Sequence, residues 1–289
     1  MNSQTPSAWI AQFAGQSTPW RAELAELTTD PAIAAELGKI CDAAEKILAP
    51  VAPELLTITG PMDLIGAPRE APENAGATVP GILLAQYGAY LDVRETLSEP
   101  AEAVGHSQGV LAVAMLHDDH AQIFALARLI GAAATRETLV EGASRRGDHT
   151  PMVSVKGENL VDVDLPGDVA LAIKNSPTSE VLSGVPESLE AALSALKVEG
   201  EYLDVAAPFH NQLLDPAVAH VLEWVKACGI SLPDAADLTK AVLTEGLDWA
   251  AELNEKVPAG ATVVNLGPGT GLARLAAENF AGAGVRYIE

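Results

Sequence analysis

The sequence predicts an α/β fold, in which a core built on a parallel sheet carries a small second subdomain. Short apolar runs typical of strands precede helical patterns along residues 1–150 and 207–289, the predicted core. Two of these strands end in glycine-rich turns that lead into helices, at residues 105–109 and 267–271. Residues 151–206 instead combine several short strands with one helix, which predicts a small α+β insert.

In the first half of the chain, apolar residues from Ile33 to Leu48 recur three or four positions apart, as one helix face requires. Six prolines in residues 50–80 predict a long surface loop that holds fragments of structure, and Pro80 suits the first turn of the helix that follows. The predicted elements here are strands at residues 9–13 and 101–104, and helices at residues 31–48, 80–97, 110–116 and 119–140.

The second half begins with the insert. Only 13 residues separate Val155 from Val169, which is barely enough for a crossover helix, so we predict a trimmed subdomain with a loop there. The predicted elements are strands at residues 152–155, 169–173, 180–182, 202–205 and 262–266, a helix at residues 186–196, further helices after residue 210, and a last helix after residue 271.

Composition excludes several classes of function. Lys and Arg number 17 against 39 Asp and Glu, and a net charge of -22 repels nucleic acids and anionic membrane surfaces. No run approaches 18 apolar residues and the N-terminus lacks a basic segment, so neither a membrane span nor a signal peptide is predicted. Cys41 and Cys228 are expected to be reduced thiols of a cytoplasmic protein.

The pattern that carries chemistry is Gly-His-Ser-Gln-Gly at residues 105–109, between a strand and a helix. It is typical of a nucleophile elbow, in which Ser107 projects from a sharp turn that only small flanking residues permit. The helix behind it favours negative charge, and the N–H of Gln108 can donate to an oxyanion. A serine nucleophile needs a base, and His210 directly follows a strand, although a surface-loop histidine is the alternative. His106 is expected to shape the elbow.

Four motifs occur in order: Phe-Ala-Gly-Gln at residues 13–16, the elbow, Pro-Phe-His at residues 208–210, and Leu-Gly-Pro-Gly at residues 266–269. Together they resemble the acyltransferase family that loads acyl-CoA units in fatty acid and polyketide synthesis. Within it, the chain is most similar to the N-terminal acetyltransferase domain of bacterial type I fatty acid synthases. The resemblance covers nearly the whole chain and implies an α/β-hydrolase-like core with a ferredoxin-like subdomain at residues 151–206.

The resemblance also implies residue roles. Ser107 would attack the thioester, and His210 would act as general base and then as general acid. The backbone N–H groups of Gln16 and Gln108 would form the oxyanion hole. A backbone carbonyl near Asp248 would orient the histidine, although a solvated loop acid is the alternative there. Asn175 matches an asparagine near the acyl site, although Asn-Ser-Pro is also a plain turn signal.

The acyl unit depends on one position in the helix after the elbow. Malonyl-specific relatives place an arginine there to pair with the free carboxylate, and the matching residue here is Ala133. A small uncharged acyl group is therefore expected, unless Arg136 supplies the missing charge; Arg128 should face elsewhere. Phe209 would narrow the pocket towards a two-carbon unit, or simply pack in the core.

The sequence thus predicts acetyl transfer from acetyl-CoA, through an acetyl ester of Ser107, to the phosphopantetheine thiol of an acyl carrier protein. No metal and no tightly bound cofactor is expected. The expected partners are the carrier and the other domains of a type I fatty acid synthase. The alternatives are a malonyl transferase, a serine hydrolase with the same elbow, and a non-catalytic structural module of a megasynthase.

Overall fold

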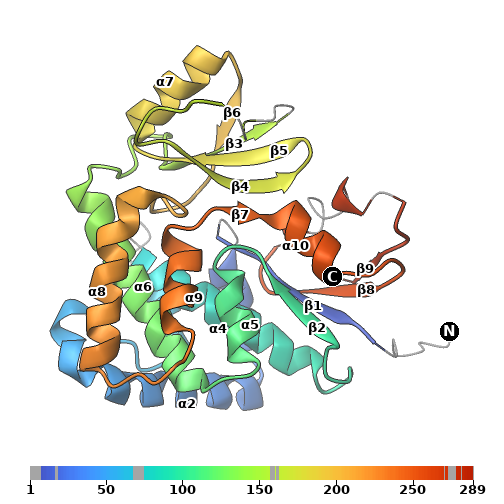
Figure 1. The fold of residues 1–289 in the computed structure, drawn as a ribbon. Helices are drawn as coiled ribbons and strands as arrows, with labels where there is room; N and C mark the ends of the chain where they lie inside the picture. Colours follow the sequence, from blue (N-terminus) through green and yellow to red (C-terminus); the bar gives the residue numbers. More distant parts are fainter. Residues whose placement is uncertain are drawn as a thin grey trace.

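The computed structural model describes residues 8–16, 19–67, 75–156, 160, 163–269, 271–272, 278–280 and 282–288. Two sheets organise them, as Figure 1 shows. The first is parallel throughout and has the order β2-β1-β8-β9; its strands are β1 (Ile10–Phe13), β2 (Glu102–Gly105), β8 (Thr262–Leu266) and β9 (Arg286–Ile288). The predicted α/β fold with a parallel sheet is confirmed.

Strands β1, β2 and β8 are largely buried on both faces, and their side chains point alternately to one face and the other. Ile10, Val104 and Val263 pack on one face against Trp249 and Leu253 of α10 (Trp249–Lys256). The intervening residues of the same strands face the main hydrophobic core. The core is built by α1 (Trp20–Leu27), α2 (Pro31–Leu48), η1 (Ala49–Glu54), α3 (Pro61–Gly66), α4 (Ala75–Val93), α5 (Gly109–Met115), α6 (His120–Val140), η2 (Gln212–Leu214), α8 (Asp215–Ala227) and α9 (Ala235–Leu243).

The register of the parallel sheet brings three predicted motifs to one edge. Phe13 of β1 lies opposite both Gly105 of β2 and Leu266 of β8. The carboxyl ends of these strands therefore coincide, and the turns that follow them lie close together. In open α/β sheets this edge is where ligands bind.

The second sheet has the order β6-β3-β5-β4-β7 and lies with α7 (Pro186–Leu196) above the other helices in Figure 1. Its strands are β3 (Met152–Lys156), β4 (Ala170–Ser176), β5 (Ser179–Ser183), β6 (Gly200–Tyr202) and β7 (Leu247–Asp248). It has its own hydrophobic cluster, which includes Val153, Leu182 and Leu189. β7 comes from the core part of the chain and pairs in parallel with β4, so it joins the small sheet to the core.

Two sequence predictions for the first half of the chain are corrected by the structure. Residues 50–80 hold the expected fragments of structure, η1 and α3, but they do not simply cross the surface, because Ile58 and Leu64 are buried. The next helix extends back to Ala75 in the described part of the chain, so Pro80 lies inside α4. Most residues of α4 are buried, and this packing outweighs the one backbone hydrogen bond that a proline removes.

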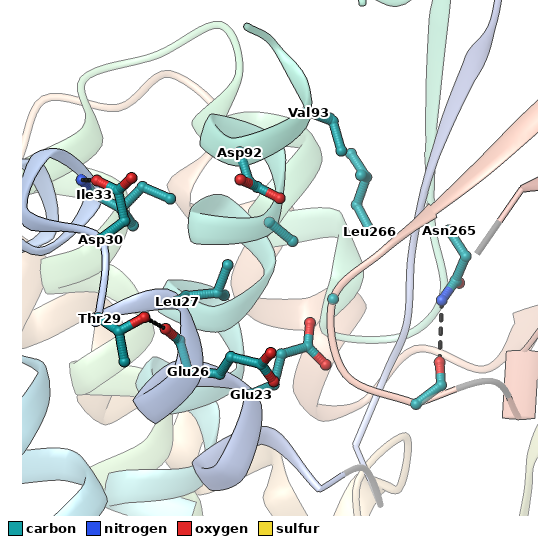
Figure 2. A pocket seen from close by; sticks show the side chains of 13 residues that line it. Glu23, Glu26, Leu27, Thr29, Asp30, Ile33, Asp92, Val93, Asn265 and Leu266 are labelled. Atoms are coloured by element: carbon teal, nitrogen blue, oxygen red, sulfur yellow. Dashed lines mark hydrogen bonds between the residues drawn. The ribbon is translucent and has the colours of Figure 1, made fainter. Parts of the chain in front are cut away.

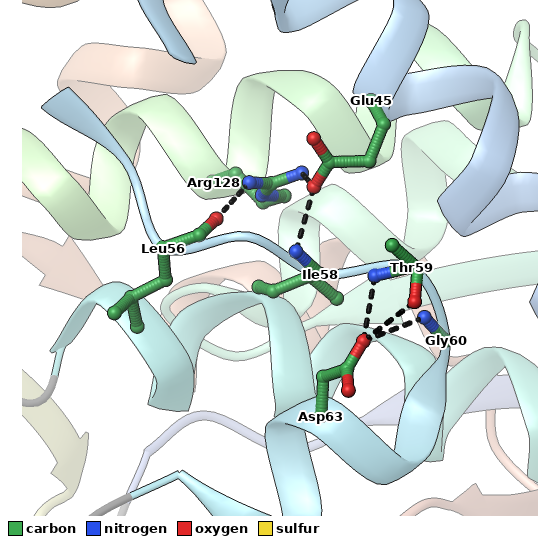
Figure 3. A network of polar contacts seen from close by, with 7 residues as sticks. All are labelled: Glu45, Leu56, Ile58, Thr59, Gly60, Asp63 and Arg128. Carbon is green, nitrogen blue, oxygen red and sulfur yellow. Dashed lines mark hydrogen bonds and ion pairs between the residues drawn. The ribbon is translucent and has the colours of Figure 1, made fainter. Parts of the chain in front are cut away.

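A buried polar network holds the segment between α2 and α3 in place (Figure 3). The guanidinium of Arg128 on α6 forms an ion pair of 2.6 Å with Glu45 on α2 and also donates to the carbonyl of Leu56. Glu45 accepts a further hydrogen bond of 2.7 Å from the N–H of Ile58. Arg128 therefore faces α2, which confirms the prediction that it points away from position 133.

The loop predicted between β3 and β4 lies partly outside the described residues; residues 160 and 163–169 of it contain no helix. Most of the predicted last helix, after residue 272, also lies outside them. In the described ranges, no helix is both long enough and apolar enough to cross a membrane.

Candidate active site

Ser107 stands on a turn that only glycine neighbours allow. Its φ is 54°, a left-handed conformation that is uncommon for a residue with a side chain. A Cβ on Gly105 would lie 2.4 Å from the backbone of Gly109 and Val110, and a Cβ on Gly109 would lie 2.5 Å from the carbonyl oxygen of Phe13. The strand, the turn and α5 are thus pressed together, and the serine is pushed out of the turn, as in a nucleophile elbow.

The hydroxyl of Ser107 meets the imidazole of His210. Ser107 Oγ and His210 Nε2 are 2.7 Å apart, and both residues are buried. On the other side of the ring, His210 Nδ1 lies 2.6 Å from the carbonyl oxygen of Glu245. A carbonyl can only accept, so Nδ1 carries the ring proton and Nε2 offers its lone pair to the serine. This is the tautomer that a general base needs.

Burial keeps His210 neutral. Burial lowers the pKa of His210 to about 4. The hydrogen bond to Glu245 raises this pKa, but by less, and the nearby His106 lowers it slightly because two charged rings would repel each other. The ring is therefore unprotonated at neutral pH and can accept a proton from the serine. Its low basicity also makes it a good acid once it is protonated.

Two backbone donors lie beside the serine. A Cβ on Gly15 would be 3.1 Å from the Cβ of Ser107, so the chain at Gly15 and Gln16 passes directly next to the elbow. Gln108 directly precedes α5, at its N-cap, and is buried. Among the hydrogen bonds of the described residues, the backbone N–H groups of Gln16 and Gln108 have no acceptor. Their role as an oxyanion hole stays a prediction.

His106 links the elbow to the small sheet. Its Nε2 lies 2.8 Å from Oδ1 of Asn175, and its ring stands edge-on to Trp249 with the centroids 5.2 Å apart. Burial lowers the pKa of His106 to about 4, so this ring is neutral as well. Asn175 belongs to β4 and is buried, which differs from the plain turn position considered for it.

Comparison with known proteins gives no matching family model. In sequence, the chain is similar to the fatty acid synthase subunit beta of Gibberella zeae, at 24% identity over 69% of this chain and 12% of that protein. It is similar to the malonyl CoA-acyl carrier protein transacylase of Bacillus subtilis, at 32% identity over 31% of this chain and 30% of that protein. It is also similar to highly-reducing polyketide synthase 1 of Aureobasidium melanogenum, at 26% identity over 85% of this chain and 11% of that protein.

The chain thus resembles the acyltransferases of fatty acid and polyketide synthesis. It spans between 11% and 30% of the length of these three relatives. Its fold is similar to that of the malonyl CoA-acyl carrier protein transacylase from Coxiella burnetii, with a TM-score of 0.77 and 19% identity over 99% of this chain and 95% of that one. The resemblance drawn from the four motifs is confirmed, and the finer match to a bacterial acetyltransferase domain stays a prediction.

The base is oriented by a backbone carbonyl, as predicted, but the prediction of Asp248 as its position is wrong. The carbonyl that accepts from His210 belongs to Glu245, three residues before Asp248. Asp248 lies in β7, and its half-exposed side chain accepts from the N–H of Ala251 at the start of α10. The alternative of a solvated acid describes it better. A backbone carbonyl has no side-chain signature, so the sequence could indicate the segment but not the residue.

Ala133 and Phe209, the residues predicted to select the acyl unit, are buried, but their roles stay predictions. Ala133 shares its face of α6 with Glu137, four residues on, and Glu137 lies 3.5 Å from His220 on α8. Ala133 therefore faces α8. Phe209 is packed in the main core, and Arg136 has an exposed side chain.

The glycine-rich turn after β8 borders a pocket of about 500 Å³, shown in Figure 2. Gly267 and Gly269 have φ angles of 103° and 84°, and the side chain of Asn265 closes the turn by donating to the carbonyl of Gly269. The pocket is lined by four acids, Glu23, Glu26, Asp30 and Asp92, which repel phosphate. The glycine-rich sequence therefore serves as the predicted turn after a strand and not as a phosphate-binding loop. Across the described ranges, no cluster of three or more His, Cys, Asp or Glu could hold a metal ion.

The sequence does not predict two contacts of this site. Trp249 supports the ring of His106, and Asn211 anchors the chain directly after His210. A single indole or amide next to a motif forms no pattern of its own. The proximity of Asn211 to His210 was the one available signal.

Proposed function

We propose that this chain is an acyl-CoA:acyl carrier protein transacylase that works through an acyl ester of Ser107. The observation that carries the proposal is the buried hydrogen-bonded series from Ser107 through His210 to the carbonyl of Glu245. The elbow supports acyl transfer in particular, and so do the N–H groups of Gln16 and Gln108, for which the described residues supply no acceptor, because such groups suit a tetrahedral oxyanion. The similarity to acyl carrier protein transacylases supports the same reaction.

In the first half-reaction, His210 Nε2 takes the hydroxyl proton as Ser107 Oγ attacks the thioester carbonyl carbon. The N–H groups of Gln16 and Gln108 stabilise the oxyanion, and the loss of one such donor typically slows the reaction by about 10² to 10³. As the C–S bond breaks, His210 returns the proton to the departing CoA thiolate. The acyl group is then held as an ester on Ser107.

In the second half-reaction, the phosphopantetheine thiol of the carrier takes the place of CoA. His210 accepts the thiol proton as the sulfur attacks the acyl ester, and it then protonates Ser107 Oγ as the C–O bond breaks. The serine and histidine end in their starting protonation states. Each step uses a neutral histidine first as base and then as acid, which agrees with its tautomer.

The similarity to named malonyl transferases favours malonyl as the acyl unit over the acetyl unit predicted from the sequence. One observation on this chain favours acetyl. Malonyl carries a carboxylate, and burying it without a charged partner is costly. Arg128, the buried arginine of α6, is already occupied by Glu45 and the carbonyl of Leu56. The proposal therefore keeps both units, with malonyl supported by the comparisons and acetyl by this ion pair.

A transfer assay decides between these units and tests the reaction itself. Acetyl-CoA and malonyl-CoA compete at equal concentration for transfer to a phosphopantetheinylated carrier, and the acyl-carrier and the free acid are quantified. The proposal predicts that acyl-carrier exceeds free acid. Release mainly as free acid would instead indicate a serine hydrolase, and no turnover of either thioester would indicate a structural module. A synthase context and a cytoplasmic location are part of the proposal, supported by the fatty acid synthase relative.

A further inference from the structure

The residue directly after His210 is held in an unusual way. Asn211 is 3% exposed, and its side-chain amide makes three hydrogen bonds. Nδ2 donates to the carbonyl oxygens of Ser183, at 2.9 Å, and Asp168, at 3.1 Å. Oδ1 accepts from the N–H of Leu213, at 2.9 Å. Both Nδ2 hydrogens and the amide oxygen are therefore used.

These bonds connect the two parts of the molecule. Ser183 ends β5 of the small sheet, and Asp168 lies in the turn just before β4, so both carbonyls belong to the small subdomain. They are themselves fixed, because Ser183 is fully buried and a Cβ on Gly184 would lie 2.6 Å from the carbonyl oxygen of Asp168. The backbone N–H of Asn211 donates instead to the core, to the carbonyl of Leu243 at the end of α9.

His210 needs such support. Its φ is 59°, a left-handed conformation that is held in a folded protein only where the surroundings impose it. The hydrogen bond from Nδ1 to Glu245 fixes the ring at one end, but the backbone at residue 210 is fixed by the bonds of its neighbour. A shift of the backbone would move Nε2 away from Ser107.

We propose that Asn211 is a positioning residue for the base, and that its amide ties His210 to the small sheet in the geometry that reaches Ser107. This inference rests on the proposed function, since it takes His210 as the base. Asparagine suits the position because it offers two donors to two carbonyls and one acceptor to an N–H. An aspartate would set a carboxylate against two carbonyl oxygens, and a serine has too few donors.

The test is the variant Asn211→Ala, measured by NMR titration of the histidine rings and by the rate of Ser107 acylation. In the wild type, the pKa of His210 is expected at about 4. Release of the backbone admits water to the ring, so the pKa should rise towards 6.5 by at least ~1 unit. Acylation should slow by ~10²-fold, as expected for a displaced base. His106, the titratable neighbour whose charge acts on His210, should keep its own pKa and serves as an internal reference.

A matched control separates positioning from general loss of stability. Thr150 is also buried, and the single hydrogen of its hydroxyl has two carbonyl acceptors within reach, those of Met152 and Leu203, next to the small sheet. Thr150→Val removes that hydroxyl without touching residue 211. It should lower the free energy of unfolding but leave the pKa of His210 and the acylation rate unchanged. If Asn211→Ala does not fold, Asn211→Ser, which keeps one donor, replaces it.

The outcomes distinguish the two proposals. A raised His210 pKa with slower acylation in the Asn211 variant, and neither change in Thr150→Val, supports the positioning role. An unchanged pKa and rate in a folded Asn211 variant would overturn it while the proposed function stands. If the pKa rises but the wild type never acylates Ser107, the contact fixes the ring but the proposed function fails, and with it the role as positioning residue for a base.

Discussion

The rate of Ser107 acylation should be nearly independent of pH down to about pH 5, since the pKa of His210 is lowered to about 4. Only the pH of the acylation reaction is varied, and the protein is the wild type. With that pKa, ~97% of His210 is neutral at pH 5.5, whereas a histidine at the ordinary value of 6.5 would be only ~9% neutral. The two cases therefore differ by ~10-fold in rate at a single pH.

The assay is single-turnover acylation followed by intact-protein mass, with kcat/KM taken from pH 4 to 8. An acetyl-pantetheine thioester serves as the donor because it lacks the phosphates of CoA, which titrate in the same range. The acidic limb should have its midpoint near pH 4, and the rate should fall as His210 gains a proton. A midpoint near 6.5 would refute the reasoning that burial, rather than the Glu245 carbonyl, dominates the environment of the base.

Three further predictions follow from the same contacts. His106 and His210 both have a folded pKa of about 4, below the ordinary 6.5, so the unfolded chain binds more protons as pH falls. The contribution of each histidine to stability should be level above pH 6.5 and smaller at pH 5 by ~2 kcal/mol, and the pKa of Glu23, which burial raises to about 7, acts in the opposite direction. Urea unfolding of the Glu23→Gln variant isolates the histidines, and equal stability of that variant at pH 7 and 5 would contradict this. Gly105→Ala should slow acylation by at least ~10²-fold, because its Cβ would lie 2.4 Å from backbone atoms of the elbow; a wild-type labelling rate would count against that geometry. Arg128→Leu should cost ~3 kcal/mol of stability by leaving the Glu45 carboxylate without its partner, with an unchanged acylation rate; a loss under 1 kcal/mol would show that the pair is weak.

Much of the fold could be predicted because periodicity and turn residues agree with it. The helix at residues 186–196 and the strand at residues 262–266 have the predicted bounds. Elements that lack such a pattern were missed. β7 and β9 are only two and three residues long, and they form because a neighbouring strand offers an edge.

The site was predictable to the extent that side chains carry its chemistry. The spacing around Ser107 indicates an elbow, because glycine is required on both sides of the serine. The parts supplied by the backbone or by tertiary contact were not predictable. The carbonyl of Glu245 and the amide of Asn211 act through positions that only the folded chain brings to His210. The position of Pro80 inside α4 was not predictable for the same reason, since the burial of α4 outweighs the preference of proline for the first turn of a helix.

The central claim is that Ser107 carries the acyl group, and intact-protein mass spectrometry tests it most directly. The protein is exposed briefly to acetyl-CoA or malonyl-CoA, with Ser107→Ala treated in parallel. The account predicts a single acyl adduct on the wild type and none on the variant, and the mass of the adduct identifies the preferred unit. An adduct that persists in Ser107→Ala, or no adduct from either thioester, would contradict it.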